Sequence, residues 1–285
     1  GETTPAIVVT PASMTTYSVT VTVGTCSNAT SVQITVNPAP TASITVDETS
    51  GLANNDGTIC AGASAMLTAS GGGTYLWSTG ATTAVITVTP AGSTTYTVTV
   101  TSVNGCTATA STTITVNPLP AAAISVAETS GTTNDDGIIC AGATVVLTAS
   151  GGGTYAWSTG ATTPAISVTP GGTTTYTVTV TSISGCTATA STTITVNPIP
   201  TVGITVSETS GTTPNDGIIC SGSTVTLTGT GGGTYAWSTG ASSPSITVSS
   251  GGNYDVTVTN AANCTATDAI TVAYSSPSAV DLGTD

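Results

Sequence analysis

Short stretches in which apolar and polar residues alternate dominate this chain. In "TYTVTVT", Tyr176, Val178 and Val180 alternate with threonines, which is the period of two expected of a strand with one buried and one wet face. The same kind of pattern recurs on either side of this stretch, separated by Gly- and Asn-rich turns. It indicates about seven short strands in 80 residues, and hence a β-sandwich. The strand candidates include 122–126, 144–150, 154–159, 164–170, 174–182 and 186–196.

The pattern repeats with a period of 80 residues. "VNPAP", "VNPLP" and "VNPIP" end at Pro40, Pro120 and Pro200, and the three tryptophans are in phase with them. A unit of this length can bury a core of its own, so we expect an all-β tandem array of sandwich domains of about 80 residues each. The expected repeats are 39–118, 119–198 and 199–276, preceded by the C-terminal half of another repeat at 1–38 and followed by a linker or tail at 277–285.

The first residues match the middle of a repeat. "GETTPAIVVTP" at Gly1 corresponds to "GATTAVITVTP" at Gly80. Residues 1–38 therefore supply only the later strands of a sandwich, and such a half cannot cover its own apolar face. We expect the missing strands to lie upstream in a longer polypeptide, the alternative being that another chain donates them. The residues expected to lie against water are Ile7, Val9, Tyr17, Val19 and Val21.

The composition excludes most chemistry. The chain has 13 carboxylates and no Lys, Arg, His or Phe, for a net charge of -13. A Ser or Cys nucleophile has no basic side chain to activate it, and a phosphate has no cation to meet it, so we expect no enzyme and no nucleic-acid partner. No apolar run is long enough to cross a bilayer, so membrane insertion is not expected. The abundant, alternating β-branched residues argue against disorder.

The run "GGGTYAWSTGATTPAISVTPGGTTTYTVTVTSISGCTATASTTITVNP" resembles the Ig-like and PKD-like repeats of very large Bacteroidetes surface proteins. These include the gliding-adhesin (SprB-type) repeats, which the type IX secretion system exports. The resemblance covers essentially the whole chain. It implies Ig-like sandwiches, a place outside the cell or on its surface, and an adhesive or structural role. The partners it implies are further repeats of the same polypeptide or neighbouring chains of a fibre, with surface glycans as a further class.

Seven regularly placed cysteines predict an oxidising, extracellular environment. Two sets of disulfides are consistent with their spacing. Pairing within units joins Cys60 to Cys106, Cys140 to Cys186 and Cys220 to Cys264, and leaves Cys26 with a partner outside the chain. Pairing across units joins Cys26 to Cys60, Cys106 to Cys140 and Cys186 to Cys220. We favour the first set because it closes each domain on itself.

Acidic residues gather before the first cysteine of each unit, and no cation in the chain can pair with them. Carboxylate oxygens grouped on an extracellular loop suit Ca²⁺, whereas the plainer interpretation is that "NDG" and "DDG" are turns capped by their own side chains. We favour turns and keep calcium as the alternative; no other cofactor is expected. The candidate ligands are Asp47, Asp56, Glu128, Asn134, Asp135, Asp136, Glu208 and Asp216, with Glu48 beside them.

The sequence thus predicts a non-enzymatic structural or adhesive section of a long secreted or surface protein, such as a fibre, stalk or filament. The alternative is a carbohydrate-binding module accessory to a secreted enzyme. That alternative depends on aromatic side chains that stack on sugars, but an aromatic pair that recurs once per domain is more often part of the core. The expected core aromatic residues are Trp77, Trp157, Trp237, Tyr96 and Tyr176.

Overall fold

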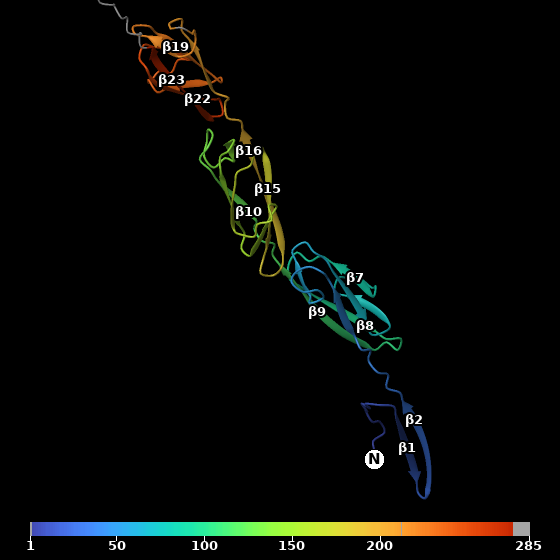
Figure 1. The fold of residues 1–285 in the computed structure, drawn as a ribbon. Coiled ribbons are helices and arrows are strands. Elements are labelled where there is room, and N and C mark those ends of the chain that lie inside the picture. Colours follow the sequence, from blue (N-terminus) through green and yellow to red (C-terminus); the bar gives the residue numbers. More distant parts are fainter. Residues whose placement is uncertain (1, 212, 276–285) are drawn as a thin grey trace, which may run out of the picture. The chain divides into compact units, whose positions relative to one another are not determined.

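The computed structural model describes residues 2–211 and 213–275, and every regular element within them is a β-strand (Figure 1). The strands form one two-stranded hairpin and three sandwiches, so the expected all-β tandem array is confirmed. The contacts divide the chain into two units: residues up to Leu119 together with Ile183–Cys186, and Pro120–Ser182 together with Thr187 onward. Gly1 and the expected tail at 277–285 lie outside the described residues. In the described part of the chain, no helix is long and apolar enough to cross a membrane.

The second sandwich shows the topology that all three share. Its smaller sheet has the order β10-β12-β14 and its larger sheet the order β11-β16-β15-β13. All pairs are antiparallel except β11 with β16, which run parallel. This is an immunoglobulin-like arrangement, in which the chain starts in one sheet as β10 and crosses to the other as β11. The strands are β10 (Ala123–Ala127), β11 (Ile138–Cys140), β12 (Val145–Ser150), β13 (Thr154–Trp157), β14 (Ala165–Val168), β15 (Thr174–Thr181) and β16 (Thr187–Asn197).

The first and third sandwiches repeat this order strand for strand. The first consists of β3 (Ser43–Asp47), β4 (Thr58–Cys60), β5 (Ala65–Ser70), β6 (Thr74–Trp77), β7 (Val85–Val88), β8 (Thr94–Thr101) and β9 (Thr107–Asn117). The third consists of β17 (Gly203–Ser207), β18 (Ile218–Cys220), β19 (Val225–Thr230), β20 (Thr234–Trp237), β21 (Ser245–Val248), β22 (Gly252–Thr259) and β23 (Thr265–Ser275). The alternation pattern did not predict β4, β11 and β18, because three residues are too few to show a period.

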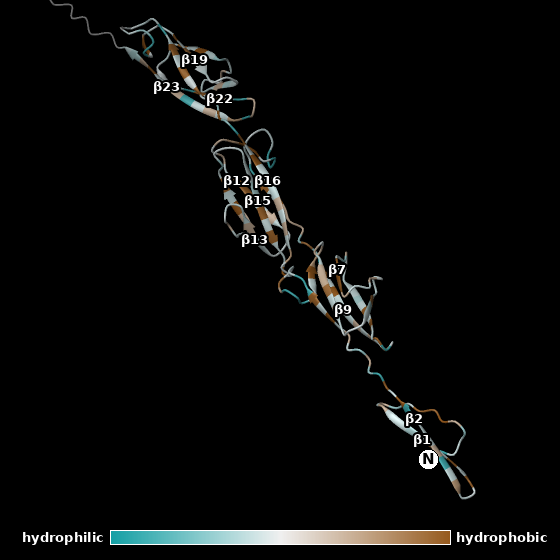
Figure 2. Cartoon of the chain, turned by 90° about the vertical axis from the view of Figure 1, so that its right-hand side faces the viewer, coloured by the Kyte–Doolittle hydropathy of each residue, from teal (hydrophilic) through white to brown (hydrophobic). Residues whose placement is uncertain are grey.

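Each sandwich has its own core, built from the inward-facing residues of both sheets. The apolar residues lie mainly on the sandwich strands, shown in brown in Figure 2. Trp77, Trp157 and Trp237 are buried, and each indole N–H donates a hydrogen bond of 2.9–3.0 Å to a carbonyl oxygen six residues further on. Tyr96 and Tyr176 are buried too. The tryptophans therefore offer no face on which a sugar can stack.

The triple-glycine turns join the two sheets where only glycine fits. Gly153 has φ +113°, and a Cβ atom there would overlap the carbonyl oxygen of Thr181 on the neighbouring strand. Gly73 and Gly233 meet Thr101 and Thr259 in the same way. The run is thus a structural turn, set by the close approach of two backbones.

The N-terminal hairpin consists of β1 (Thr15–Val23) and β2 (Cys26–Ile34), the counterparts of β8 and β9. Val19 is 55% exposed, whereas its counterpart Val98 in the first sandwich is 0% exposed. Ile7 and Val21 are exposed as expected, while Val9 and Tyr17 are half-buried. The apolar face that a sandwich covers with its other sheet is therefore open in this hairpin.

Candidate functional site

Three acidic loops, which we define as residues 48–57, residues 128–137 and the described residues 208–211 and 213–217, are each organised around a buried glutamate. In the second loop, the Glu128 Oε2 atom accepts a hydrogen bond from the backbone N–H of Ser130 at 2.7 Å, and Oε1 accepts one from Asp136 at 3.3 Å. The backbone N–H of Glu128 in turn donates to the Asp135 Oδ1 atom at 3.0 Å. Glu48 and Glu208 make the equivalent bonds in the other loops. The hydrogen bonds that these carboxylates accept from backbone N–H groups offset the desolvation cost of their burial.

Each loop delivers a cysteine to a fixed place at the end of a short strand. The Asp136 Oδ1 atom accepts a hydrogen bond from the backbone N–H of Ile138 at 2.8 Å, and the Ser130 Oγ atom accepts one from Cys140 at 3.2 Å. The register then places Cys140 opposite Asn197, at the C-terminal end of β16. Cys60 is placed by the same two hydrogen bonds, opposite Asn117, and Cys220 lies opposite Ser275 after the equivalent bond from Ile218 to Asp216.

The second group of cysteines lies in the turns between the last two strands of each sandwich. We call these turns the hairpin tips and define them as residues 102–106, 182–186 and 260–264, each of which ends in a cysteine. In the third tip, the Asn260 Oδ1 atom accepts hydrogen bonds from the backbone N–H groups of Ala262 and Cys264, both at 3.0 Å. In the first tip, the Ser102 Oγ atom accepts one from Cys106 at 3.2 Å. Each tip cysteine therefore sits at the N-terminal end of the last strand of its sandwich.

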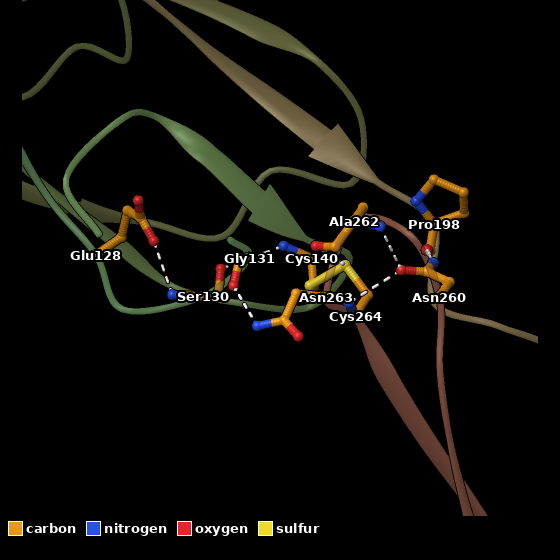
Figure 3. Close-up of a disulfide and its surroundings, with 9 residues drawn as sticks. All are labelled: Glu128, Ser130, Gly131, Cys140, Pro198, Asn260, Ala262, Asn263 and Cys264. Carbon is orange, nitrogen blue, oxygen red and sulfur yellow. Dashed lines mark hydrogen bonds between the residues drawn. A yellow bond between two sulfur atoms is a disulfide. The ribbon is translucent and has the colours of Figure 1, made fainter. Parts of the chain in front are cut away.

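Two disulfides join a loop cysteine of one sandwich to the tip cysteine of the next. They are Cys60–Cys186 and Cys140–Cys264, each with a Cα–Cα distance of 5.5 Å. Figure 3 shows the second of these bonds. Beside the second bond, the Asn263 Nδ2 atom donates a hydrogen bond to the carbonyl oxygen of Gly131 at 2.8 Å. We call each such loop–tip pair a joint.

The backbones in a joint approach each other closely. At the first joint, a Cβ atom on Gly185 would lie 2.7 Å from the carbonyl carbon of Gly51, so the tip presents glycine where it meets the loop. At the second joint, the Asn260 Nδ2 atom also donates a hydrogen bond to the carbonyl oxygen of Pro198 in the linker at 2.9 Å. Each joint is thus held by a disulfide together with backbone contacts.

Both sets of disulfides proposed from the spacing are wrong. Within a sandwich, Cys140 lies opposite Asn197, and Cys186 comes eleven residues before Asn197 along β16. At roughly 3.3 Å per strand residue, the two cysteines are about 36 Å apart, far beyond the Cα separation of about 7 Å that a disulfide tolerates. The same geometry excludes Cys60–Cys106 and Cys220–Cys264.

The set that joined neighbouring cysteines across units is wrong as well. It paired Cys106 with Cys140, but Cys106 comes just before β9, at the end of that strand away from the linker to the second sandwich. Cys140 pairs with Cys264 instead. Among the described residues, Cys26, Cys106 and Cys220 are free thiols. The parallel pairing of β11 with β16, which alternation does not reveal, would have been needed to find the true pairs.

The calcium candidates lie around the buried glutamates. Asp56, Asp136 and Asp216 each cap the amide two residues further on, Asp135 caps the amide of Glu128, and Asp47 and Asn134 are exposed. Asp135 has φ +62°, a turn conformation that Asn and Asp tolerate. Among the described residues, no three acidic, Cys or His side chains are grouped so as to hold a metal ion. These hydrogen bonds support the turn interpretation, and calcium binding stays a prediction to be tested.

Excess chelator is expected to leave the melting temperature unchanged. The reason is that both Glu128 oxygens and the Asp136 Oδ1 atom already accept backbone hydrogen bonds in the loop. Differential scanning calorimetry with EDTA, and then with added CaCl₂, measures this. A melting temperature that falls in EDTA and recovers with calcium would establish a metal site and overturn the turn interpretation.

Replacing Glu48 by Gln is expected to lower the free energy of unfolding of the first sandwich by about 2 kcal/mol. The amide group would set an N–H donor against a backbone N–H of Ser50 or Asp56, and a hydrogen bond to a charged group contributes about 1.5–3 kcal/mol. Amide hydrogen exchange at Ser50 and Asp56 should also accelerate.

The neighbouring Asp47→Asn is the matched control, because Asp47 is exposed while Glu48 is 3% exposed. Its effect should stay within about 0.5 kcal/mol. Equal effects of the two substitutions would show that general charge repulsion, rather than the hydrogen bonds of Glu48, accounts for the loss.

No family model and no curated protein matches this chain. Among solved structures, it is similar to one from a study of the host cell surface retention of a 1.5-MDa bacterial ice-binding adhesin: 19% identity, 84% of this chain and 99% of that one, TM-score 0.30. A second is a Ca²⁺-stabilized adhesin that helps an Antarctic bacterium bind ice: 20% identity, 92% and 82% covered, TM-score 0.35. A third is a Bacteroides ovatus glucan-utilization protein, SGBP-B, in complex with a mixed-linkage heptasaccharide: 16% identity, 76% and 65% covered, TM-score 0.19.

These TM-scores are too low to support an argument about function. The fold and the joints themselves define the class: tandem immunoglobulin-like sandwiches in which the disulfides join successive repeats instead of closing each one.

Proposed function

We propose that this chain is a load-bearing, non-enzymatic section of a long adhesive protein that lies outside the cell or on its surface. The observation that carries the proposal is the pair of disulfides that join successive sandwiches. A disulfide between successive sandwiches adds a second covalent link beside the backbone, which suits a section that transmits force. Disulfides also persist mainly in oxidising, extracellular surroundings.

The disulfides change the covalent path that a pulling force follows. Force that enters the second sandwich at Cys186 can leave it along β16 and the linker at Pro198, 12 residues further on. Without the bonds, the force would run through the whole 80-residue repeat. A sandwich that unfolds between two folded neighbours therefore lengthens the chain by only a small part of what its repeat length would allow.

The surface fits this passive role. The three tryptophans are buried, and the acidic side chains cap their own loops. A chain without cations also has no residue with which to bind an anionic substrate. We infer that a separate part of the same protein or fibre holds the ligand, and that gliding or attachment through a type IX-exported adhesin is the specific role implied by the resemblance to Bacteroidetes repeats.

Immunogold labelling of intact native cells tests the proposal. Antibodies raised against the whole chain should label material outside the cell envelope. Their Fab fragments should leave glycan binding by the organism unaffected, because a separate part holds the ligand. Label found only inside sectioned cells would overturn the proposal. Binding of the purified chain to a glycan array would favour the carbohydrate-binding alternative instead.

A further inference from the structure

Strand β18, which follows the third acidic loop, ends in a cysteine that has no partner in the described chain. Cys220 is a free, exposed thiol, whereas Cys60 and Cys140, at the same position in the other two sandwiches, are both in disulfides. Two of the three copies of this position thus already bind a hairpin tip within the same molecule. The first two repeats therefore show what a cysteine at this position binds when a tip is present.

The glutamate and aspartate hydrogen bonds of the third loop match those of the two loops that have bound a tip, while the Ser210 hydroxyl donates to the Glu208 Oε2 atom at 3.4 Å. The Glu208 carboxylate accepts hydrogen bonds from Ser210 at 2.7 Å and Asp216 at 3.1 Å, and the Asp216 Oδ1 atom accepts one from Ile218 at 2.8 Å. Glu208 is only 5% exposed, as is Glu128 in the second loop. The loop therefore does not need a tip in order to form.

The backbone that would meet a tip is also in place. Gly211 has φ +88°, against +91° for Gly131, whose carbonyl oxygen accepts the hydrogen bond from Asn263. The third sandwich thus presents a loop glycine and a thiol at the positions that the second joint uses.

The two joints also define which partner fits. In both, the residue before the tip cysteine lies against the glycine of the loop: Gly185 against Gly51, and Asn263 against Gly131. Neither contact uses a charged group. The loop therefore selects a β-hairpin tip that ends in Gly-Cys or Asn-Cys, as "SISGC" and "NAANC" do.

We propose that the third acidic loop is a docking site for the cysteine-bearing hairpin tip of a further sandwich of this repeat type, which it binds through a disulfide from Cys220. The proposal rests on the proposed function, since it extends the same joint beyond the third sandwich. Cys106 is the complementary case: a tip cysteine without a loop, whose Sγ atom lies 3.6 Å from the carbonyl oxygen of Asn37.

The bond forms by thiol–disulfide exchange with a small-molecule disulfide as the oxidant. The Cys220 thiolate attacks oxidised glutathione, which forms a mixed disulfide and releases one glutathione thiolate. The tip thiolate then attacks the Cys220 sulfur and releases the second. Two protein thiols are oxidised by two electrons, one glutathione disulfide is reduced to two thiols, and the two protons leave with the glutathione.

The first experiment supplies a tip in cis. A copy of residues 118–198 is joined after Ser275, which repeats the linker length of the second joint, and the copy's counterpart of Cys140 is changed to serine. After oxidation with a glutathione redox pair, Cys220 should lose nearly all of its reactivity to an alkylating reagent. Mass spectrometry should find it bonded to the copy's counterpart of Cys186. The matched control lacks that tip cysteine and should keep Cys220 alkylatable.

Cys220 that stays alkylatable in the extended chain, or that bonds to any cysteine other than the tip, would overturn the proposal. The second experiment oxidises the unextended chain. A dimer linked from Cys220 to Cys26 or Cys106 supports the docking site with a tip supplied by another copy. A Cys220–Cys220 dimer would overturn the docking site. None of these results bears on where the protein lies on the cell, so they are independent of the labelling test.

Discussion

Replacing Cys140 by serine is expected to destabilise the second and third sandwiches together. Chain entropy predicts a loss of about 5 kcal/mol of unfolding free energy for a loop of this size, since 124 residues separate Cys140 from Cys264. The cores should remain intact, because the core clusters contain no cystine. Urea unfolding, followed by amide hydrogen exchange resolved to each sandwich, measures the loss.

Cys220→Ser is the matched control, since it removes the cysteine at the same position of the third sandwich, where no disulfide forms. Its stability should stay within about 0.5 kcal/mol of the parent. If Cys220→Ser cost as much as Cys140→Ser, the loss would arise from the loop itself and not from the joint.

Proteolysis under non-reducing conditions distinguishes the three sets of disulfides directly. Trypsin has no site in this chain, but cleavage after Asp and Glu leaves Cys60 and Cys106 on fragment 57–128, Cys140 and Cys186 on 137–208, and Cys264 on 256–268. The joints should hold these three fragments together and release Cys220 on 217–255. Pairing within units would instead leave 57–128 and 137–208 as separate species.

Replacing Leu67 by Ala is expected to lower the free energy of unfolding of the first sandwich by about 2–5 kcal/mol. Leu67 on β5 is 0% exposed and packs in the same core cluster as Trp77. Its removal leaves a cavity between the two sheets. Urea unfolding with hydrogen exchange over β5 to β9 measures the loss, and Trp77 fluorescence should report it as well.

Met66→Ala is the control, because Met66 precedes Leu67 on the same strand, has a similar volume and is 39% exposed on the opposite face. We expect a change within about 0.5 kcal/mol. A similar cost for both substitutions would contradict the sandwich core as described, since it would mean that both faces of β5 are packed.

The sequence by itself determined the architecture of each repeat. Alternation such as that of Tyr176, Val178 and Val180 defines one buried face, and a strand's side chains have only two faces to choose between. All three of these residues are indeed at least 93% buried. The open apolar face of the N-terminal hairpin followed from the same rule, because Val19 and Val21 have no second sheet in residues 1–38 to cover them.

Only the tertiary structure decided how the cysteines pair. Spacing reports distance along the chain, whereas a disulfide requires two Cα atoms within about 7 Å in space. The short strand β11 runs parallel to β16, which carries Cys140 to the end of the sandwich opposite to Cys186. Three residues show no period that alternation could reveal. The register of that one short strand therefore decides that the disulfides join successive sandwiches instead of closing each one.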